Sequence, residues 1–274
     1  MRSKAIASAL GALLLGLGRT ALAAPRVAPL VTIAPGVEMA PATELGGDAS
    51  WAARVLLVDP AKATFLVRYD GSRPSLGQWR QRFPTALAIV NGSFYSVDGP
   101  KGAEVRPTCD LISDGKPVRG AGCHRQDALF FGARPKAPGV IPAALVSREP
   151  PRSAPRFFTP QDFRPDQWQE ALKSFPALVR GGAPACTGVH YCAESSRTTA
   201  LAQLRDGRIL LFASQWPAIR REVGKWLAEE LGAVEALNLD GGPEATLALR
   251  GEPAEDSVST PGVGLPMVLL ILPP

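Results

Sequence analysis

The sequence predicts an α+β domain with a large β core, because strand signals outnumber helix signals along its 274 residues. Short apolar runs bounded by glycine, proline or aspartate recur through the chain, and such runs are typical of buried strands. Helical patterns are few, and no repeat or low-complexity linker divides the sequence. We therefore expect a single domain with a mixed, mostly antiparallel sheet or sandwich and a few flanking helices.

The expected strands comprise two hairpins and several separate runs. In the first hairpin, residues 54–58 and 64–69 flank an Asp-Pro turn. In the second, residues 201–204 and 208–212 flank an Asp-Gly pair, which favours tight hairpin turns. Further strands are expected at 86–90, 110–113, 128–131, 177–179, 234–239, 246–249 and 263–272.

The expected helices cover residues 76–83, 165–174 and 218–231. The last has the clearest pattern, because its apolar residues recur every three or four positions and place one face toward a core. Gly232 follows this helix as a glycine stop. Residues 132–163 are rich in proline and predict long surface loops with at most short strands.

The beginning of the sequence has the three regions of a secretory signal peptide. Basic residues precede an apolar run over residues 5–17, and the segment 21–23 has the small residues of a cleavage site. The apolar run is shorter than the roughly 20 residues that span a bilayer. We expect residues 1–23 to be removed and residues 24–274 to be exported to the periplasm or the extracellular space, without stable membrane insertion.

The charge of the chain argues against a nucleic-acid partner. Residues 1–23 hold three basic residues and no acidic ones, so their removal lowers the formal charge from +5 to +2. The remaining basic residues are scattered along the chain rather than clustered in a stripe. We therefore expect no binding to nucleic acid.

Four cysteines in an exported chain predict two disulfides. Of the three possible connectivities, we favour the local pairs Cys109 with Cys123 and Cys186 with Cys192, which would staple loops. A zinc site is the alternative, because the two histidines of the chain lie near two of these cysteines. The sequence lacks the usual spacing of zinc ligands, so disulfides are the better interpretation.

The end of an expected buried strand presents a carboxylate. Residues 236–239 are part of an apolar run, and Asp240 follows them. Gly241 and Gly242 come next and permit positive φ and close approach of another backbone. The same residues are compatible with an ordinary Asp-Gly hairpin turn. A carboxylate beside a turn without side chains can also act on a bound ligand.

Two other polar residues stand at the ends of expected strands. Asn91 leaves the apolar run 88–90, and the small Ser93 leaves space beside its amide. An Asn-Gly turn explains this segment without any function. Arg197 precedes the expected strand 201–204, where its planar guanidinium suits either an internal carboxylate or a phosphate.

Four ordered motifs give the chain a resemblance to a known family. They are Asn91 to Tyr95, Pro176 to Arg180, Arg197-Thr198 and Leu231 to Gly242. In this order and spacing they resemble the phosphodiester glycosidase family. The chain departs from the family pattern at Ser93, where a glycine is usual, and at Pro243 and Glu244, where small residues commonly follow the glycines.

The resemblance implies hydrolysis of the glycosidic bond of a sugar-1-phosphodiester, so together with the signal peptide it predicts an exported hydrolase. Its partner would be a carbohydrate phosphodiester, and no cofactor is required. Asp240, Asn91 and Arg197 are the expected catalytic residues. Asp240 would serve as nucleophile or base, and Arg197 would stabilise the charge that develops on the phosphate.

Further residues would orient the sugar hydroxyls or the phosphate oxygens. They are Gly241, Gly242, Thr246, Ser93, Arg180 and Glu244. Glu244 would either form a two-carboxylate site with Asp240 or face solvent. Arg180 and Asp98 are weaker candidates, because each would equally form a surface ion pair. No spacing requires a metal, although a divalent cation beside Asp240 or Asp98 would find oxygen ligands.

Three other classes of function were compared with the sequence: a glycan-binding module, a serine hydrolase and a P-loop enzyme. A non-catalytic envelope module that binds phosphorylated glycans would use the same residues, but on a closed or shallow surface rather than in a cleft. A serine hydrolase is disfavoured, because no Gly-x-Ser-x-Gly motif is present. A P-loop enzyme is disfavoured by the lack of a lysine-containing glycine loop.

Overall fold

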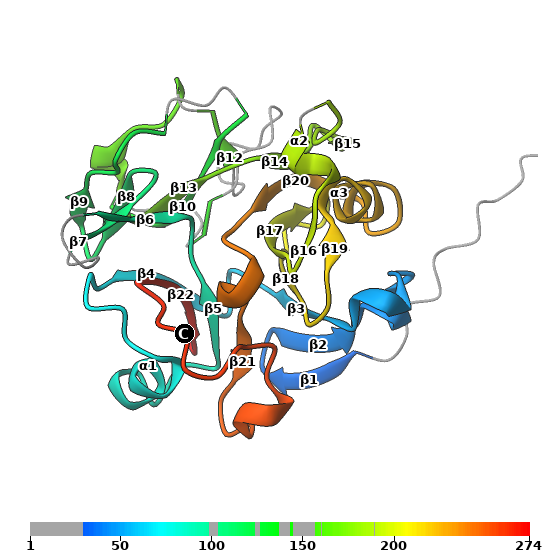
Figure 1. Ribbon diagram of the computed structural model, residues 1–274, viewed down its shortest axis with the longest axis horizontal. Helices are drawn as coiled ribbons and strands as arrows, with labels where there is room; N and C mark the ends of the chain where they lie inside the picture. The colour runs from blue at the N-terminus through cyan, green and yellow to red at the C-terminus, as the bar shows by residue number, and fades with distance from the viewer. Residues whose placement is uncertain are drawn as a thin grey trace, which may run out of the picture.

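The computed structural model describes residues 30–98, 104–123, 127–136, 143–144, 157–159, 161–188 and 190–274. Figure 1 shows β-strands in two facing layers, with helix α3 (Arg220–Glu229) on one side of the molecule and helix α1 (Leu76–Arg82) on the other. Every strand pairing in these residues is antiparallel. The expected α+β fold is confirmed. The predicted signal peptide lies outside the described residues.

The first layer is an eight-stranded sheet whose central strands are buried on both faces. Its strand order is β1 (Val31–Ala34), β2 (Val37–Pro41), β3 (Ala53–Val58), β18 (Ile209–Ser214), β17 (Thr199–Leu204), β20 (Ala233–Asn238), β14 (Ala177–Arg180) and β15 (Ala183–Pro184). Leu56 of β3 faces the second layer, whereas Val55 and Leu57 face the side of α3. Burial of both faces explains why these strands read as continuous apolar runs.

The second layer consists of two smaller sheets. One has the order β21 (Leu247–Leu249), β5 (Ala88–Asn91), β22 (Met267–Leu272), β4 (Thr64–Tyr69). The other has the order β11 (Ala143–Ala144), β10 (Leu129–Pro135), β13 (Trp168–Ser174), β8 (Leu111–Ser113), β9 (Lys116–Val118), with β12 (Phe157–Phe158) paired to β10. Apolar residues of both sheets and of the first layer form one central core.

The remaining elements are short. Two further strand pairs are β6 (Tyr95–Asp98) with β7 (Glu104–Pro107) and β16 (Ser195–Ser196) with β19 (Ala218–Ile219). A short helix, α2, covers His190–Ala193. Single turns of 3-10 helix occur at Ala42–Leu45, Ala49–Trp51, Pro165–Gln167, Gly242–Glu244 and Ala254–Asp256. None of the helices in the described ranges is long and apolar enough to cross a membrane.

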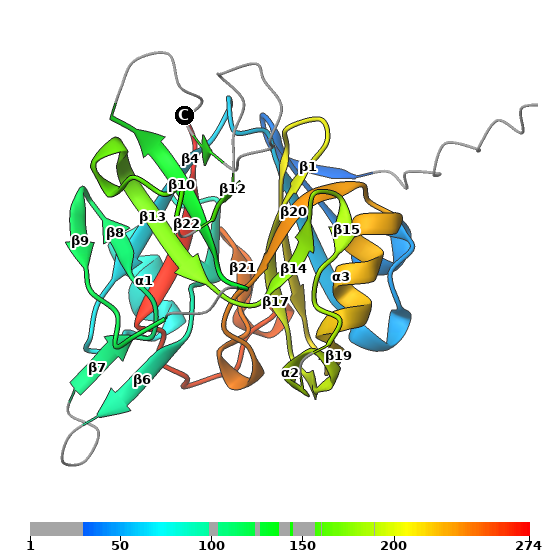
Figure 2. The same ribbon diagram turned by 90° about the horizontal axis from the view of Figure 1, so that it is seen from above.

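The outer faces of the two layers are covered by the two longer helices. Figure 2 shows α3 against the outer face of the eight-stranded sheet, where Val223 and Leu227 of α3 pack. On the opposite side, Trp79 of α1 packs on the sheet that contains β4 and donates its indole N–H to the Leu265 carbonyl at 2.8 Å. Both helices were predicted, as was the β17–β18 hairpin.

The helix predicted over 165–174 is wrong. After a single 3-10 turn, residues Trp168–Ser174 form strand β13, which pairs with β10 and β8. Its charged residues mimic the polar face of a helix but are buried, since Glu170 is 0% exposed and pairs with Arg68 at 2.9 Å and Arg134 at 3.3 Å. The local pattern of this segment favours a helix, but ion pairs with residues from other strands stabilise it as a strand.

The hairpin predicted for residues 54–69 is also wrong. Strand β3 pairs with β2 and β18 in the first layer, whereas β4 pairs with β22 in the second. The chain therefore crosses between the layers after Val58. Strand β3 lies between β2 and β18, whereas β4 is the edge strand of its sheet and pairs with β22.

Both predicted disulfide pairs are present. Cys109 is bonded to Cys123, and Cys186 is bonded to Cys192, so no cysteine is left for zinc. The second disulfide closes a loop around Tyr191, at the same side of the molecule as the start of α3. The first disulfide encloses the β8–β9 hairpin, and both links restrict the chain segments that they close.

The aromatic cluster between α3 and the first sheet predicts a large effect of one substitution. Phe212 is 0% exposed and lies 5.9 Å from Trp51 and 5.6 Å from Trp226, measured between ring centroids. We expect Phe212→Ala to lower the free energy of unfolding by about 3–5 kcal/mol in denaturant melts. As a control, Trp216→Ala removes a ring that is 60% exposed and should change it by about 0.5 kcal/mol or less. Equal losses in the two variants would contradict this account of the core.

Candidate active site

Asp240 lies where the chain crosses from one layer to the other. Strand β20 belongs to the first layer and β21 to the second, and Figure 1 shows the connection running between them. Neither the Asp-Gly turn after β20 nor the Asn-Gly turn after β5 closes a hairpin, since their flanking strands do not pair with each other. The amide N–H of Asp240 donates to the Gly92 carbonyl at 2.9 Å. The two turns therefore meet in the connection between β20 and β21, residues 239–246, which we call the crossing.

The side chain of Asn91 holds both ends of the crossing. Its Nδ2 atom donates to the Asp240 carbonyl at 2.8 Å, and its Oδ1 atom accepts from the Thr246 N–H at 2.9 Å. Asn91 is 1% exposed, so its amide serves the backbone rather than a ligand. The structure thus places it as a positioning residue beside Asp240.

The two glycines after Asp240 are required for different reasons. A Cβ atom on Gly241 would lie 2.4 Å from the Arg197 carbonyl oxygen, which is too close for any side chain. Gly242 has φ of 60°, in the region that favours glycine, and its N–H donates to the same carbonyl at 2.9 Å. The crossing is therefore packed directly against the backbone of Arg197.

The guanidinium of Arg197 is bonded to the surrounding chain. Its Nη2 atom donates to the Ala245 carbonyl at 2.9 Å, its Nε atom lies 3.4 Å from the Ser214 carbonyl, and its Nη1 atom donates to the Thr260 hydroxyl. Burial lowers the pKa of Arg197. Arg197 thus joins three segments around the crossing.

Asp240 is half-buried, and its Oδ1 atom accepts the Gly241 N–H at 2.8 Å. The pKa of Asp240 is raised to about 7, chiefly by burial and in smaller part by the negative charge of Glu244. The Gly241 hydrogen bond and the positive charge of Arg220 lower the pKa against these effects. A carboxyl that titrates near neutral pH is suited to acid–base or nucleophilic chemistry.

Glu244 supplies a second carboxylate at this site rather than facing solvent. It is half-buried, and its Oε1 atom accepts the Tyr95 hydroxyl at 2.9 Å. Arg73 Nη2 donates to the same hydroxyl oxygen at 3.0 Å. Burial, followed by the bond to Glu244, raises the pKa of Tyr95 to about 12, so the hydroxyl keeps its proton. Sequence analysis did not predict Tyr95 or Arg73 as site residues.

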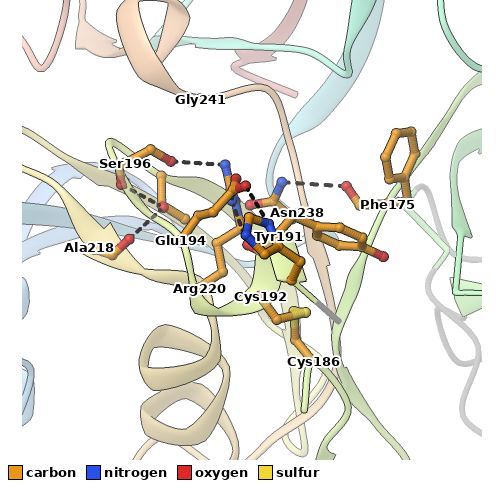
Figure 3. Close-up of polar contacts among 12 residues, drawn as sticks. Phe175, Cys186, Tyr191, Cys192, Glu194, Ser196, Ala218, Arg220, Asn238 and Gly241 are labelled. Carbon is orange, nitrogen blue, oxygen red and sulfur yellow. Dashed lines mark hydrogen bonds and ion pairs between the residues drawn. A yellow bond between two sulfur atoms is a disulfide. The ribbon is translucent and has the colours of Figure 1, made fainter. Parts of the chain in front are cut away.

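Arg220 is the further residue that sequence analysis missed. Figure 3 shows its side chain rising from the start of α3 toward Ser196, below Gly241. Its Nη2 atom donates to the Ser196 hydroxyl at 2.8 Å, and that hydroxyl lies 3.9 Å from the position of a Cβ atom on Gly241. The sequence did contain one signal. Arg220 lies in the first turn of the predicted helix, where a cation opposes the helix dipole and therefore suggests a role other than helix stability.

The other predicted residues lie at varying distances from Asp240. Thr246 is buried, and its hydroxyl donates to the Glu244 carbonyl at 2.9 Å. Ser93 is 2% exposed, close to the crossing. Arg180 is not brought to the site, since it pairs with Glu235, five residues or about 16 Å along β20 from Asp240. Asp98 lies at the exposed end of β6.

Within the ranges that the structure covers, Asp240 is not part of a metal-ligand cluster or of the cavity described below. Among the described residues, no three His, Cys, Asp or Glu side chains gather where they could hold a metal ion. A cavity of about 440 Å³ lies away from Asp240 and is lined by residues that include Arg54, Gln215 and Ser257.

Comparison with known families decides the relationship of the chain. The phosphodiester glycosidase family model matches residues 84–271, which is more than half of the sequence. This chain belongs to the phosphodiester glycosidase family. The matched range includes Asn91, Arg197, Arg220, Asp240 and Glu244, whereas Arg73 lies before it. A search of curated proteins found no match.

Solved structures share the fold of this phosphodiester glycosidase family member. The catalytic domain of zebrafish N-acetylglucosamine-1-phosphodiester alpha-N-acetylglucosaminidase, auto-inhibited by its pro-peptide, has 19% identity and a TM-score of 0.54, over 81% of this chain and 76% of that one. A Burkholderia pseudomallei protein described as exported has 17% identity and a TM-score of 0.55, over 81% and 74%. A hypothetical protein from Synechocystis has 14% identity and a TM-score of 0.53, over 90% and 61%. These identities establish a common fold.

The raised pKa of Asp240 predicts a pH-dependent loss of stability. The unfolded carboxyl ionises near 3.8 and the folded one near 7, so between these values the folded state keeps a proton that the unfolded state releases. The free energy of unfolding therefore falls as pH rises through this window. Asp240→Asn lacks this loss. The free energy of unfolding of this variant should exceed that of the wild type by about zero near pH 4 and by about 2–4 kcal/mol above pH 7.

Denaturant melts at several pH values measure this difference. Asp98→Asn, which changes an exposed carboxylate, is the matched control and should show no such growth with pH. If the difference in the free energy of unfolding between Asp240→Asn and the wild type were the same at both ends of the pH range, the raised pKa would be contradicted.

Proposed function

We propose that this family member is an exported hydrolase that cleaves the glycosidic bond of a sugar-1-phosphodiester. The observation that carries the proposal is the half-buried Asp240 carboxyl, held at the crossing next to a second acidic residue, Glu244. Family membership supports the type of bond cleaved. The geometry supports Asp240 as the group that acts on the anomeric carbon.

In the proposed reaction, the bond between the anomeric carbon and the phosphate oxygen breaks, and its electron pair leaves with the phosphate. Ionised Asp240 either attacks the anomeric carbon or removes a proton from the attacking water. Water supplies the hydroxyl group of the free sugar, and the phosphate is released as a phosphomonoester. That leaving group is a stable anion, so strong general-acid assistance is not required.

The contacts of the other residues support distinct roles. Asn91 and Arg197 bond to backbone carbonyls and N–H groups around Asp240, so we assign both to positioning. Glu244, held by the Tyr95 hydroxyl, is suited to orient water or a sugar hydroxyl. The proposed mechanism requires no cofactor and no metal ion, although the oxygen atoms of Asp240 could bind a divalent cation.

Two features support export of the mature chain, residues 24–274. The first is the signal-peptide pattern of residues 1–23. The second is the pair of disulfides, which persist in oxidising compartments such as the periplasm and the extracellular space. A carbohydrate phosphodiester is the proposed substrate there.

Turnover by a single variant tests the assignment of Asp240. Purified residues 24–274 should hydrolyse at least one member of a panel of sugar-1-phosphodiesters, and Asp240→Asn should lower kcat by about 10³-fold or more. Glu229→Gln, on the exposed face of α3, is the matched control and should keep full activity. Arg197→Ala should lower activity together with thermal stability, because it loosens the crossing.

Two outcomes would reject parts of this proposal. Equal turnover by Asp240→Asn would remove Asp240 from catalysis. Tight binding of phosphorylated glycans with no turnover of any diester would instead favour a non-catalytic glycan-binding module.

The pH dependence of kcat/KM tests the protonation state of Asp240. Since the proposed role needs the ionised carboxylate, kcat/KM should rise about tenfold per pH unit below a pKa near 7 and level off above it. A rate measured across this range with a diester substrate shows the inflection. If kcat/KM fell through pH 7, the protonated carboxyl would be the active form, contrary to the proposal.

A further inference from the structure

The start of α3 places an arginine against the crossing. Arg220 is the first residue of this ten-residue helix, and the preceding Ile219 has no side-chain atom that could accept a hydrogen bond from the helix end. The first turn of a helix leaves backbone N–H groups without partners inside the helix, and the helix dipole favours an anion there. Arg220 adds a formal positive charge at the same position.

Several contacts fix the guanidinium of Arg220. Nη2 donates to the Ser196 hydroxyl at 2.8 Å, and Nη1 donates to the Tyr191 carbonyl at 2.7 Å, with Glu194 Oε2 at 3.5 Å (Figure 3). The side chain is only 11% exposed. A guanidinium has five N–H groups, so donors remain for a ligand while its plane is held in place.

These contacts alone do not explain the position of the charge. A cation in the first turn of a helix opposes the helix dipole, and Arg221, the next residue, is already paired with the carboxylate of Glu222 at 3.0 Å, which leaves Arg220 as the cation to be balanced by other groups. Desolvation of a guanidinium adds to this cost. A bound anion would offset both effects, because it would meet the helix end and Arg220 together.

Asn238 provides an independent indication of a ligand. It is 1% exposed, and its Nδ2 atom donates to the carbonyls of Leu239 at 2.7 Å and Phe175 at 3.4 Å. Its Oδ1 atom is buried and has no partner among the described residues. Strand alternation places Asn238 on the face of Ala236, which α3 covers, and Figure 3 shows it beside Arg220. An unpaired buried acceptor is costly unless a ligand hydroxyl or N–H group reaches it.

We propose that Arg220, the Ser196 hydroxyl and the N-terminus of α3 bind the phosphate group of the substrate, with Asn238 Oδ1 accepting a hydrogen bond from a hydroxyl group of the same ligand. This assignment rests on the proposed function and places the phosphate beside Gly241, next to Asp240. Arg197 is less suited, because its guanidinium is bonded to backbone carbonyls and to Thr260. The carboxylate of Glu194 lies 3.5 Å from Arg220 Nη1 and offsets part of its charge.

Inorganic phosphate is the probe for this site, since it needs no knowledge of the sugar or the alcohol. Titration calorimetry on folded residues 24–274, at a pH above about 7 where phosphate is mostly a dianion, measures its dissociation constant. We expect Arg220→Gln to weaken binding by about 10- to 100-fold and Ser196→Ala by a smaller factor. Arg221→Gln removes an equal charge from the same helix turn and should change binding by about twofold or less.

A second variant at the same position keeps the test decisive if Arg220→Gln does not fold. Arg220→Lys keeps the charge but loses the planar fork, so it should bind phosphate with intermediate affinity. Circular dichroism and the melting temperature show whether each variant is folded. If Arg220→Gln is unfolded, the comparison of Arg220→Lys with the wild type decides, and equal affinity there would overturn the proposal.

The outcomes separate this site from the proposed activity. Unchanged phosphate affinity in folded Arg220→Gln, or equal losses in Arg220→Gln and Arg221→Gln, would overturn the assignment of the phosphate site. The same holds if the wild type binds no phosphate. Phosphate binding that depends on Arg220, combined with no turnover of any diester, would support the site and reject the hydrolase.

Discussion

The geometry of the candidate site depends on one buried amide. Asn91 stands at the end of β5 in the second layer, and its side chain bonds to the backbone of Asp240 and of Thr246, the two ends of a loop that arrives from the first layer. An unpaired backbone group in such a position would cost about 1–3 kcal/mol, so the two layers are fixed relative to each other at this point. The place of Asp240 is therefore set by the packing of the two sheets together with the contacts of its own loop to the Arg197 backbone.

Two arginines stand near this loop and differ in their surroundings. Arg197 donates to carbonyl groups and a hydroxyl of the folded chain, and Gly241 packs against its backbone. Arg220 instead comes from the start of a helix and bonds to Ser196, which lies beside Gly241. A guanidinium that is surrounded by backbone acceptors stabilises the loop, whereas one at a helix end retains donors for an anion. The same residue type thus serves structure in one place and suits recognition in the other.

The electrostatics of the site are set by partial burial. Asp240 loses hydration and lies near Glu244, and both effects oppose its ionisation, while Arg220 favours it. Such a balance reduces stability near neutral pH, which is common where a carboxyl has a chemical role. Glu244 stands where the family pattern leads one to expect a small residue; the Tyr95 hydroxyl donates to it, and Arg73 donates to that hydroxyl in turn. The acidic side chain therefore has partners of its own and is part of an ordered cluster.

Local patterns in the sequence determined helix α3, the β17–β18 hairpin, both disulfides and the turns that carry Asn91 and Asp240, because each depends on neighbours within a few residues. Tertiary structure decided the rest. Strand β13 departs from its helical pattern because Glu170 is neutralised by Arg68, about a hundred residues away. The β3–β4 pair separates because each strand finds partners in a different layer. Arg220 joins the site only when α3 packs against the crossing, since contacts between distant segments leave no periodic trace in the sequence.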